Sequence, residues 1–180
     1  LSRWFNAYVD LTRRFTGMKN VDFMIIGYSG HFDVFVASIL SRVKGVPIVF
    51  DAFLSLYDSL VFDRKVVKKG SLKAGFLYCV DKYSCKLADM VLLDTDQHID
   101  YFISECRLPR KIFSRILIGA DDHIFYPIGS NGKEKPFTAI HYGKYIPLHG
   151  MPYIIKAAKE LENANVRFQL IGAGGEYESS

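Results

Sequence analysis

One stretch of the sequence, residues 137–150, combines the residue types that hold a phosphate group. An apolar run is followed by Gly143 and the cation of Lys144, and the chain then turns through a proline and Gly150 before an amphipathic pattern begins. We expect a strand that breaks at Gly143, a turn and a helix. Backbone N–H groups and the positive end of a helix favour an anion at such a turn. The pattern therefore predicts phosphate binding here, with Lys144 as the cation.

The rest of the chain supplies the elements that must position this stretch. Apolar residues recur at helical spacing over residues 3–16, 33–43 and 72–87, and again after Gly150. A further helix is expected after residues 94–96, where Thr95 or Asp96 can cap its start. On the helix 72–87 we expect a buried stripe of Leu72, Phe76, Val80, Tyr83 and Leu87. Strands are expected at 22–27, 46–50, 90–93, 113–118, 137–143 and 166–171, and residues 52–71 are expected to be irregular.

Strands that are apolar throughout and alternate with helices predict parallel sheets covered on both faces. Residues 128–136 shift to turn and charged residues, which predicts a linker between two domains. We predict the fold class α/β with two Rossmann-like domains, at residues 1–127 and 137–180. The chain starts within a helical pattern and stops where a strand should lead into its next helix, so we expect both domains to be incomplete.

Ligands of such folds bind beyond the carboxyl ends of the strands. The residues expected there are Asp51, Asp94, Gly119, Lys144 and the loop that begins at Gly172. A carboxylate at the position of Asp51 can stabilise a positively charged sugar centre or accept a proton from a hydroxyl group. It can equally cap a loop or pair with Arg64. Asp94 and Asp96 flank Thr95, where a helix cap is the favoured interpretation.

Composition excludes several classes of function. The 180 residues are 49% hydrophobic and 23% charged, which is typical of a globular protein. A net charge of +4 is too small to indicate a nucleic-acid partner, and the five histidines lack the spacing of a metal site. Three cysteines without a Cys-x-x-Cys pair favour buried thiols in a reducing compartment. We predict no nucleic-acid partner, no metal and a cytoplasmic location.

Residues 64–86 carry seven basic side chains and a single acid, Asp81. A solvated helix face explains this run in the simplest way. The alternative is a surface that docks on anionic lipid, since cations near such a membrane are attracted to it. The residues expected to form that surface are Arg64, Lys65, Lys68, Lys69 and Lys73.

The glycines at 172, 174 and 175 could belong to a dinucleotide-binding loop. The full fingerprint requires glycine at 177, where this chain has Tyr177, so a nicotinamide enzyme is the weaker interpretation.

Three segments in fixed order resemble one known family. Residues 115–127 resemble its interdomain segment, residues 140–150 its "GR…KG" segment, and residues 168–174 the end of its "liG.G" strand. Together they resemble the GT-B retaining glycosyltransferases of family 4, over roughly residues 22–180.

The resemblance implies two Rossmann-like domains that face each other across a cleft, with the nucleotide sugar held mainly by the second. Lys144 falls where the family usually has arginine, and His149 where it usually has lysine. The donor phosphates would then contact Gly143, Lys144 and His149. Asp51 stands where many members have a histidine near the reacting sugar.

The resemblance also places Gly119 and Asp121 at the interdomain cleft, and Gly172 and Gly174 in a loop on the nucleotide side. The family's pair of glutamates would lie beyond Ser180, and its N-terminal glycine loop would precede Leu1.

The expected activity is that of a retaining glycosyltransferase. It would move a sugar from a nucleotide diphosphate sugar to a hydroxyl of a glycan or lipid-linked acceptor, in polysaccharide or glycolipid synthesis at the inner face of a membrane. The nucleotide sugar is the substrate, and no cofactor is expected. Alternatives are an epimerase or phosphorylase of the same fold, or a non-catalytic nucleotide- or sugar-binding module. We expect the 180-residue chain alone to be inactive.

Overall fold

The computed structural model describes residues 2–127 and 136–174 of the chain. Its residues form two compact units, divided between Gly119 and Ala120. This division precedes the domain boundary expected at residue 127. The expected linker, apart from Pro136, lies outside the described residues. The two units are described one at a time below.

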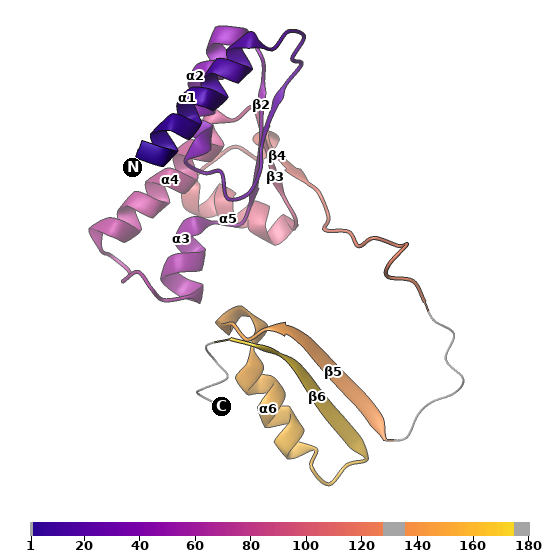
Figure 1. The fold of residues 1–180 in the computed structure, drawn as a ribbon. Coiled ribbons are helices and arrows are strands. Elements are labelled where there is room, and N and C mark those ends of the chain that lie inside the picture. Colours follow the sequence, from indigo (N-terminus) through magenta and orange to yellow (C-terminus); the bar gives the residue numbers. More distant parts are fainter. Residues whose placement is uncertain (1, 128–135, 175–180) are drawn as a thin grey trace. The chain divides into compact units, whose positions relative to one another are not determined.

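The first unit is built on a parallel sheet of four strands in the order β1-β2-β3-β4. The strands are β1 (Met24–Ile26), β2 (Ile48–Phe53), β3 (Met90–Leu93) and β4 (Phe113–Arg115), and Figure 1 shows them in one layer. All three pairings are parallel, which confirms the predicted α/β class. The strand expected at 113–118 ends early, although Ile116 N–H still donates to Leu93 O at 2.9 Å.

Helices connect these strands in the predicted order. They are α1 (Ser2–Gly17), α2 (Asp33–Lys44), α3 (Leu56–Asp58) with a π-helical turn (Ser59–Asp63), α4 (Leu72–Leu87), α5 (Asp96–Cys106) and a 3-10 turn (Arg110–Ile112). Gly45 ends α2 with φ 70°, in the left-handed region that glycine tolerates. The prediction that residues 52–71 are irregular is wrong in part, because β2 extends into this segment and α3 and the π-helical turn follow.

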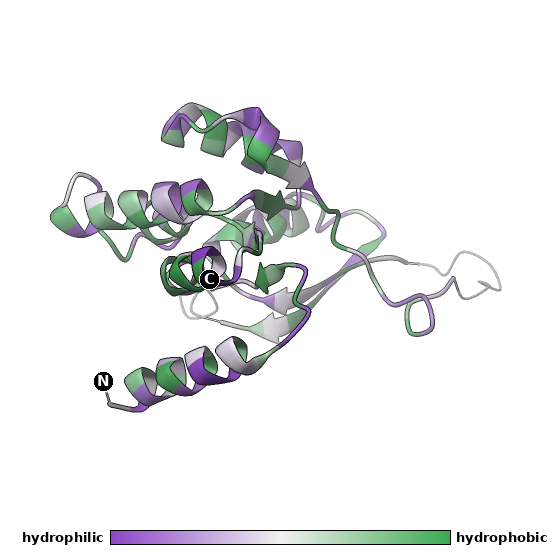
Figure 2. Cartoon of the chain, turned by 90° about the horizontal axis from the view of Figure 1, so that it is seen from above, coloured by the Kyte–Doolittle hydropathy of each residue, from purple (hydrophilic) through white to green (hydrophobic). Residues whose placement is uncertain are grey.

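Only one face of the four-stranded sheet is fully buried. Side chains such as Ile48, Phe50, Val91 and Leu93 are at most 1% exposed, whereas their strand neighbours on the other face are half-buried or exposed, with Ile25 64% exposed. The prediction of a sheet covered on both faces is therefore wrong for the described residues. The helices that cover the buried face alternate between hydrophobic and hydrophilic residues (Figure 2), as one-sided packing requires.

The buried stripe predicted for α4 is wrong except at Val80. Leu72 is 95% exposed, Phe76 59% and Tyr83 47%, and Leu87 is only half-buried. The face that α4 buries carries smaller and polar side chains instead: Ala74, Val80, Asp81, Ser84 and Cys85. Small residues let the helix lie close to its neighbours, and this is why the larger apolar side chains are directed outward.

Asp81 is the polar centre of this packing. It is 1% exposed, and its carboxylate accepts hydrogen bonds from Ser55 Oγ at 2.6 Å, Leu56 N at 3.0 Å and Tyr57 N at 2.9 Å. These donors include the first backbone N–H groups of α3, so the carboxylate caps that helix from outside. Burial raises the pKa of Asp81, and the three hydrogen bonds oppose that rise.

The second unit contains two parallel strands and one helix. They are β5 (Phe137–Lys144), α6 (Met151–Glu160) and β6 (Val166–Ala173), with a 3-10 turn (Pro147–His149) before α6. The expected strand, turn and helix are all present. β5 does not break at Gly143, however, because the pairing with β6 continues through Lys144.

The cysteines and the helices bear on the environment of the chain. All three cysteines are free. The expectation of buried thiols is confirmed for Cys85 and Cys106 and is wrong for Cys79, which is exposed. Among the described helices, none has both the length and the apolar character needed to cross a membrane.

His31 makes the stability of the first unit depend on pH. Its side chain is fully buried, burial lowers its pKa from 6.5 to about 4, and backbone groups of Leu54 and Ser29 oppose the shift without reversing it. The unfolded chain therefore binds a proton between these values that the folded chain does not. We expect the free energy of unfolding to fall by up to about 3 kcal/mol as the pH drops through this window.

Denaturant unfolding at several pH values from 7 to 4 measures this loss. The His31→Phe variant isolates it, since the raised pKa of Asp81 acts in the opposite direction in both proteins. The variant should lose less stability on acidification than the wild type. Parallel pH profiles for the two proteins would contradict the assignment.

Candidate functional site

In the first unit, a pocket of about 300 Å³ opens at the carboxyl ends of the strands. Asp51 and Asp94 supply its carboxylates. The other side chains that line it are apolar: Phe53, Leu92, Leu93, Ile116, Leu117 and Ile118. The pocket is therefore mostly apolar, with two carboxylates as its polar groups, and it lies where ligands of parallel sheets bind.

Asp51 lies inside β2 and not after it, because the strand continues to Phe53. The strand register with β3 is irregular between Asp51 and Phe53, and Asp51 is paired with Leu92. The Asp51 carboxylate is half-buried, and neither Arg64 nor any other side chain within residues 2–127 and 136–174 pairs with it. It is therefore available to a ligand in the pocket.

Asp94 forms a pair with His98 at the same edge of the sheet. His98 Nδ1 lies 2.6 Å from Asp94 Oδ1, with the Asp94 side chain 17% exposed and the His98 side chain 45% exposed. An ionised carboxylate only accepts hydrogen bonds, so in the neutral imidazole Nδ1 carries the proton and Nε2 keeps its lone pair. A carboxylate that orients an imidazole in this way is an arrangement that serves general base catalysis.

The start of α5 fixes the geometry of this pair. Thr95 is the N-cap residue, and its hydroxyl oxygen accepts a hydrogen bond from His98 N at 3.2 Å, which confirms the expected cap. Asp96 does not take part in this pair, because its carboxylate forms an ion pair with Arg115 at 2.6 Å. Burial raises the pKa of Asp58, and the positive charge of a protonated His98 opposes that rise.

Sequence reasoning missed His98. The sequence did contain a signal for it. Asp94 precedes His98 by four residues, with the helix cap Thr95 between them, and this spacing brings both side chains to the same side of the first helical turn. The histidine spacings considered in the sequence are those of metal ligands, and this pair is not one of them. Within the part of the chain that the structure describes, no three His, Cys, Asp or Glu side chains gather as metal ligands.

In the second unit, the structure brings Gly143, Lys144 and His149 together at the end of β5. His149 Nδ1 lies 2.5 Å from the carbonyl oxygen of Lys144. The imidazole also lies over Gly143, where an added Cβ would be 3.6 Å from His149 Cε1. Lys144 and His149 are both exposed. A cation and an imidazole therefore stand at one strand end, as the sequence predicted.

The hydrogen bond to Lys144 limits what His149 can do. A carbonyl oxygen only accepts, so Nδ1 carries the proton and a neutral ring has no N–H left at Nε2. A neutral His149 therefore has no N–H to donate to a phosphate, because its single N–H is already bonded to Lys144 O. Only the protonated ring can donate from Nε2. Pro152 in the first turn of α6 has no backbone N–H, so the start of this helix offers one hydrogen-bond donor fewer to a bound anion.

A second histidine, His141, lies beside this site and was not predicted. Its ring centroid is 5.9 Å from that of His149, and its Nε2 is buried without a hydrogen bond among the described residues. Alternation along a strand puts His141 and Gly143 on one face. The sequence therefore carried a signal for it.

The two glycines expected in a nucleotide-side loop have a structural role. Gly172 lies inside β6, where an added Cβ would overlap the carbonyl oxygen of Gly143. A Cβ at Gly174 would overlap the carbonyl oxygen of Tyr145. Both glycines thus permit a close approach to β5 and the residue after it. Their contact with a nucleotide stays a prediction.

Asp121 folds back on its own turn. Its carboxylate accepts a hydrogen bond from His123 N at 2.9 Å, and its carbonyl accepts from Ile124 N at 3.0 Å and Phe125 N at 2.8 Å. Gly119 is the last residue of the first unit. The assignment of Gly119 and Asp121 to a cleft between domains stays a prediction.

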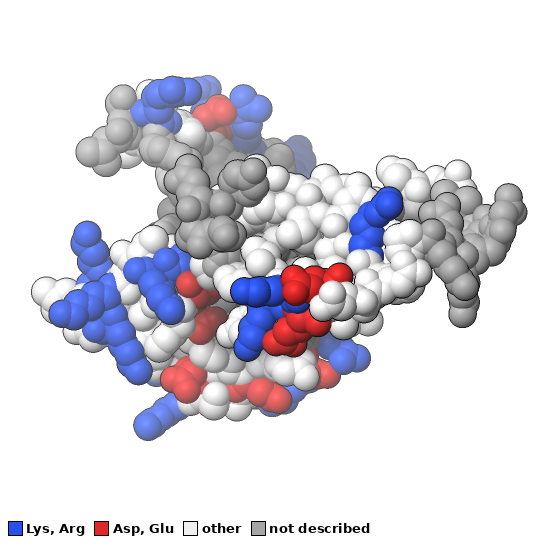
Figure 3. Space-filling view, turned by 90° about the horizontal axis from the view of Figure 1, so that it is seen from below, with Lys and Arg blue, Asp and Glu red and all other residues white. Residues whose placement is uncertain are grey.

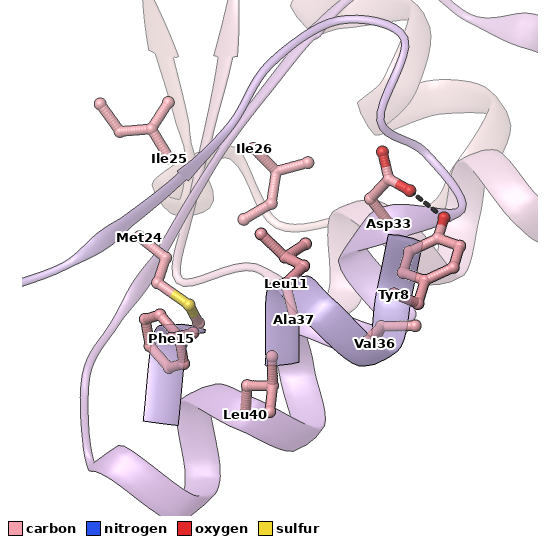
Figure 4. A pocket seen from close by; sticks show the side chains of 10 residues that line it. All are labelled: Tyr8, Leu11, Phe15, Met24, Ile25, Ile26, Asp33, Val36, Ala37 and Leu40. Atoms are coloured by element: carbon pink, nitrogen blue, oxygen red, sulfur yellow. Dashed lines mark hydrogen bonds between the residues drawn. The ribbon is translucent and has the colours of Figure 1, made fainter. Parts of the chain in front are cut away.

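A separate pocket of about 230 Å³ lies between α1, β1 and α2 (Figure 4). Apolar side chains such as Leu11, Phe15 and Leu40 line it, and its polar groups are Tyr8 and Asp33. The Tyr8 hydroxyl donates to the Asp33 carboxylate, which raises the pKa of Tyr8 to about 12. These polar groups are paired with each other, so the pocket offers little chemistry.

No known family model matches the sequence, and no curated protein matches it either.

The close approach at Gly172 gives a test of the second unit. We expect Gly172→Ala to destabilise the pairing of β5 and β6 by about 2 kcal/mol, because the methyl group forces the strands apart. Hydrogen exchange of the β5 amides, read by mass spectrometry, should become faster. Gly75→Ala is the control, since a Cβ there meets nothing within 4 Å. Unchanged exchange in Gly172→Ala would show that the strands are not so closely packed.

Proposed function

We propose that this protein is a retaining glycosyltransferase of the GT-B type, similar to family 4, which transfers a sugar from a nucleotide diphosphate sugar to a hydroxyl acceptor. The observation that carries the proposal is the grouping of Gly143, Lys144 and His149 at the end of β5. The order of the three family-like segments supports it. Two parallel α/β units are compatible with this fold but common to many functions.

The second unit would hold the donor. Lys144 is exposed and has no carboxylate partner in the described part of the chain, so its ammonium group is available to a diphosphate. Protonated His149 would add a second donor from Nε2. Positive charge placed before the reaction stabilises the negative charge that develops on the leaving diphosphate.

The first unit would hold the acceptor in the pocket beside Asp51 and Asp94. His98 Nε2 would accept the proton of the acceptor hydroxyl, and Asp94 would orient the ring and stabilise its charged form. The bond from the anomeric carbon to the phosphate oxygen breaks, and a bond to the acceptor oxygen forms on the same face of the sugar. The carboxylate of Asp51 would stabilise the positive charge on the sugar in the transition state.

The donor site is tested by nucleotide binding. We expect one of UDP, GDP, ADP or TDP to raise the unfolding temperature of the protein. Lys144→Ala should weaken binding of that nucleotide at least about tenfold in calorimetric titration, because a charge-assisted contact is lost. The control is Lys159→Ala, which removes an exposed cation from α6 of the same unit. Equal affinities for wild type and Lys144→Ala would remove Lys144 from the donor site.

The acceptor side is tested by turnover. Because the 180-residue chain alone is expected to be inactive, turnover is measured on a full-length protein that contains it. With a nucleotide sugar that this protein accepts, we expect His98→Gln to reduce kcat by about 100-fold and to leave nucleotide binding unchanged. Asp94→Asn should also lower kcat and alter its dependence on pH, since it acts through His98. His123→Gln, which changes another exposed histidine, is the control. Nucleotide binding without release of diphosphate under any condition would favour the non-catalytic binding module.

A further inference from the structure

The chain before α4 forms a basic turn, which we define as residues 64–73. Arg64, Lys65, Lys68, Lys69 and Lys73 are all exposed. Within residues 2–127 and 136–174, none of these five cations pairs with a carboxylate. Figure 3 shows Lys and Arg side chains gathered at the left of the view, over this turn and the start of α4.

The only acid in residues 64–86 does not reduce this charge at the surface. Asp81 is 1% exposed and bonded to Ser55 and the start of α3. The basic turn also precedes α4, whose N-terminus carries a partial positive charge of its own. The local surface is therefore more positive than the sequence run suggests.

Large apolar side chains stand among these cations or directly after them. Leu72 is 95% exposed, Val66 70% and Phe76 59%. Leu72 comes directly before Lys73, at the first position of α4. Phe76 stacks on Phe32, which is itself 49% exposed. Exposed apolar side chains next to a group of cations are the combination that a membrane interface accepts, because the apolar groups leave water while the cations stay at the headgroups.

The backbone of the basic turn is held in place by hydrogen bonds. Val67 N donates to Leu60 O at 3.1 Å, and Ser71 N donates to Lys68 O at 3.2 Å. Ser71 also caps α4 through its hydroxyl, which accepts from Ala74 N at 3.2 Å. Cations and apolar side chains are thus presented together by a formed turn.

We propose that the basic turn and the first two turns of α4 dock on an anionic phospholipid membrane, with Val66, Leu72 and Phe76 entering the interface. The cations would contact the headgroups, and the apolar side chains would leave water for the acyl boundary. Aliphatic residues such as Leu72 cannot stack on bases, which favours lipid over nucleic acid. This inference stands whether or not the protein transfers a sugar.

Vesicle sedimentation of the full chain tests the proposal. We expect binding to vesicles of phosphatidylcholine with about a third phosphatidylglycerol, and little binding to phosphatidylcholine alone. Lys68→Glu, Lys69→Glu and Lys73→Glu combined should lower the partition coefficient at least about 100-fold, since each cation contributes about fivefold. The matched control reverses three other lysines: Lys111, Lys156 and Lys159.

A second variant separates insertion from charge. Leu72→Ser should lower the partition coefficient about tenfold without changing net charge. Both variants alter exposed residues, and circular dichroism should show unchanged folding. Failure of the wild type to sediment with anionic vesicles would overturn the proposal. So would equal loss in the control triple variant, or tighter binding of a single-stranded oligonucleotide at the same basic turn.

Discussion

The buried carboxylate of Asp81 is the interaction on which much of the first unit depends. It joins α4 to the chain that follows β2 by accepting hydrogen bonds from Ser55, Leu56 and Tyr57. His31 Nε2 lies 3.6 Å from Asp81 Oδ1, so the loop before α2 also packs against this carboxylate. A buried carboxylate with several donors is costly to leave unsatisfied, and this constraint holds the three segments in one arrangement.

Two surfaces follow from this arrangement. On one side, α3 is held beside α5, where Asp58 lies near the pair of Asp94 and His98. On the other, α4 buries Asp81 and small side chains and therefore turns Leu72 and Phe76 outward. The candidate acceptor pocket and the proposed membrane surface thus depend on the same orientation of one helix.

The two candidate sites use histidine in the same way. In each site, Nδ1 of the histidine donates to an oxygen atom with a fixed position. The acceptor of His98 is Asp94 Oδ1 at the start of a helix, and the acceptor of His149 is Lys144 O at the end of a strand. Each ring is thereby oriented with Nε2 directed away from that oxygen. The difference lies in the acceptor, which is a side-chain carboxylate for His98 and a backbone carbonyl for His149.

The sequence by itself determined the strands, the long helices and their order, because apolar spacing and turn residues act locally, but it missed α3 and the π-helical turn after it. It identified the six strands, a helix cap at Thr95 or Asp96, of which the structure shows Thr95, and the grouping of Lys144 with His149 around Gly143. Only the tertiary structure decided which side of α4 is buried, since Asp81 is stabilised by partners far away in the chain. It likewise decided that Asp51 lies within β2 and that Gly172 faces Gly143. These contacts join distant segments, and no local pattern encodes them.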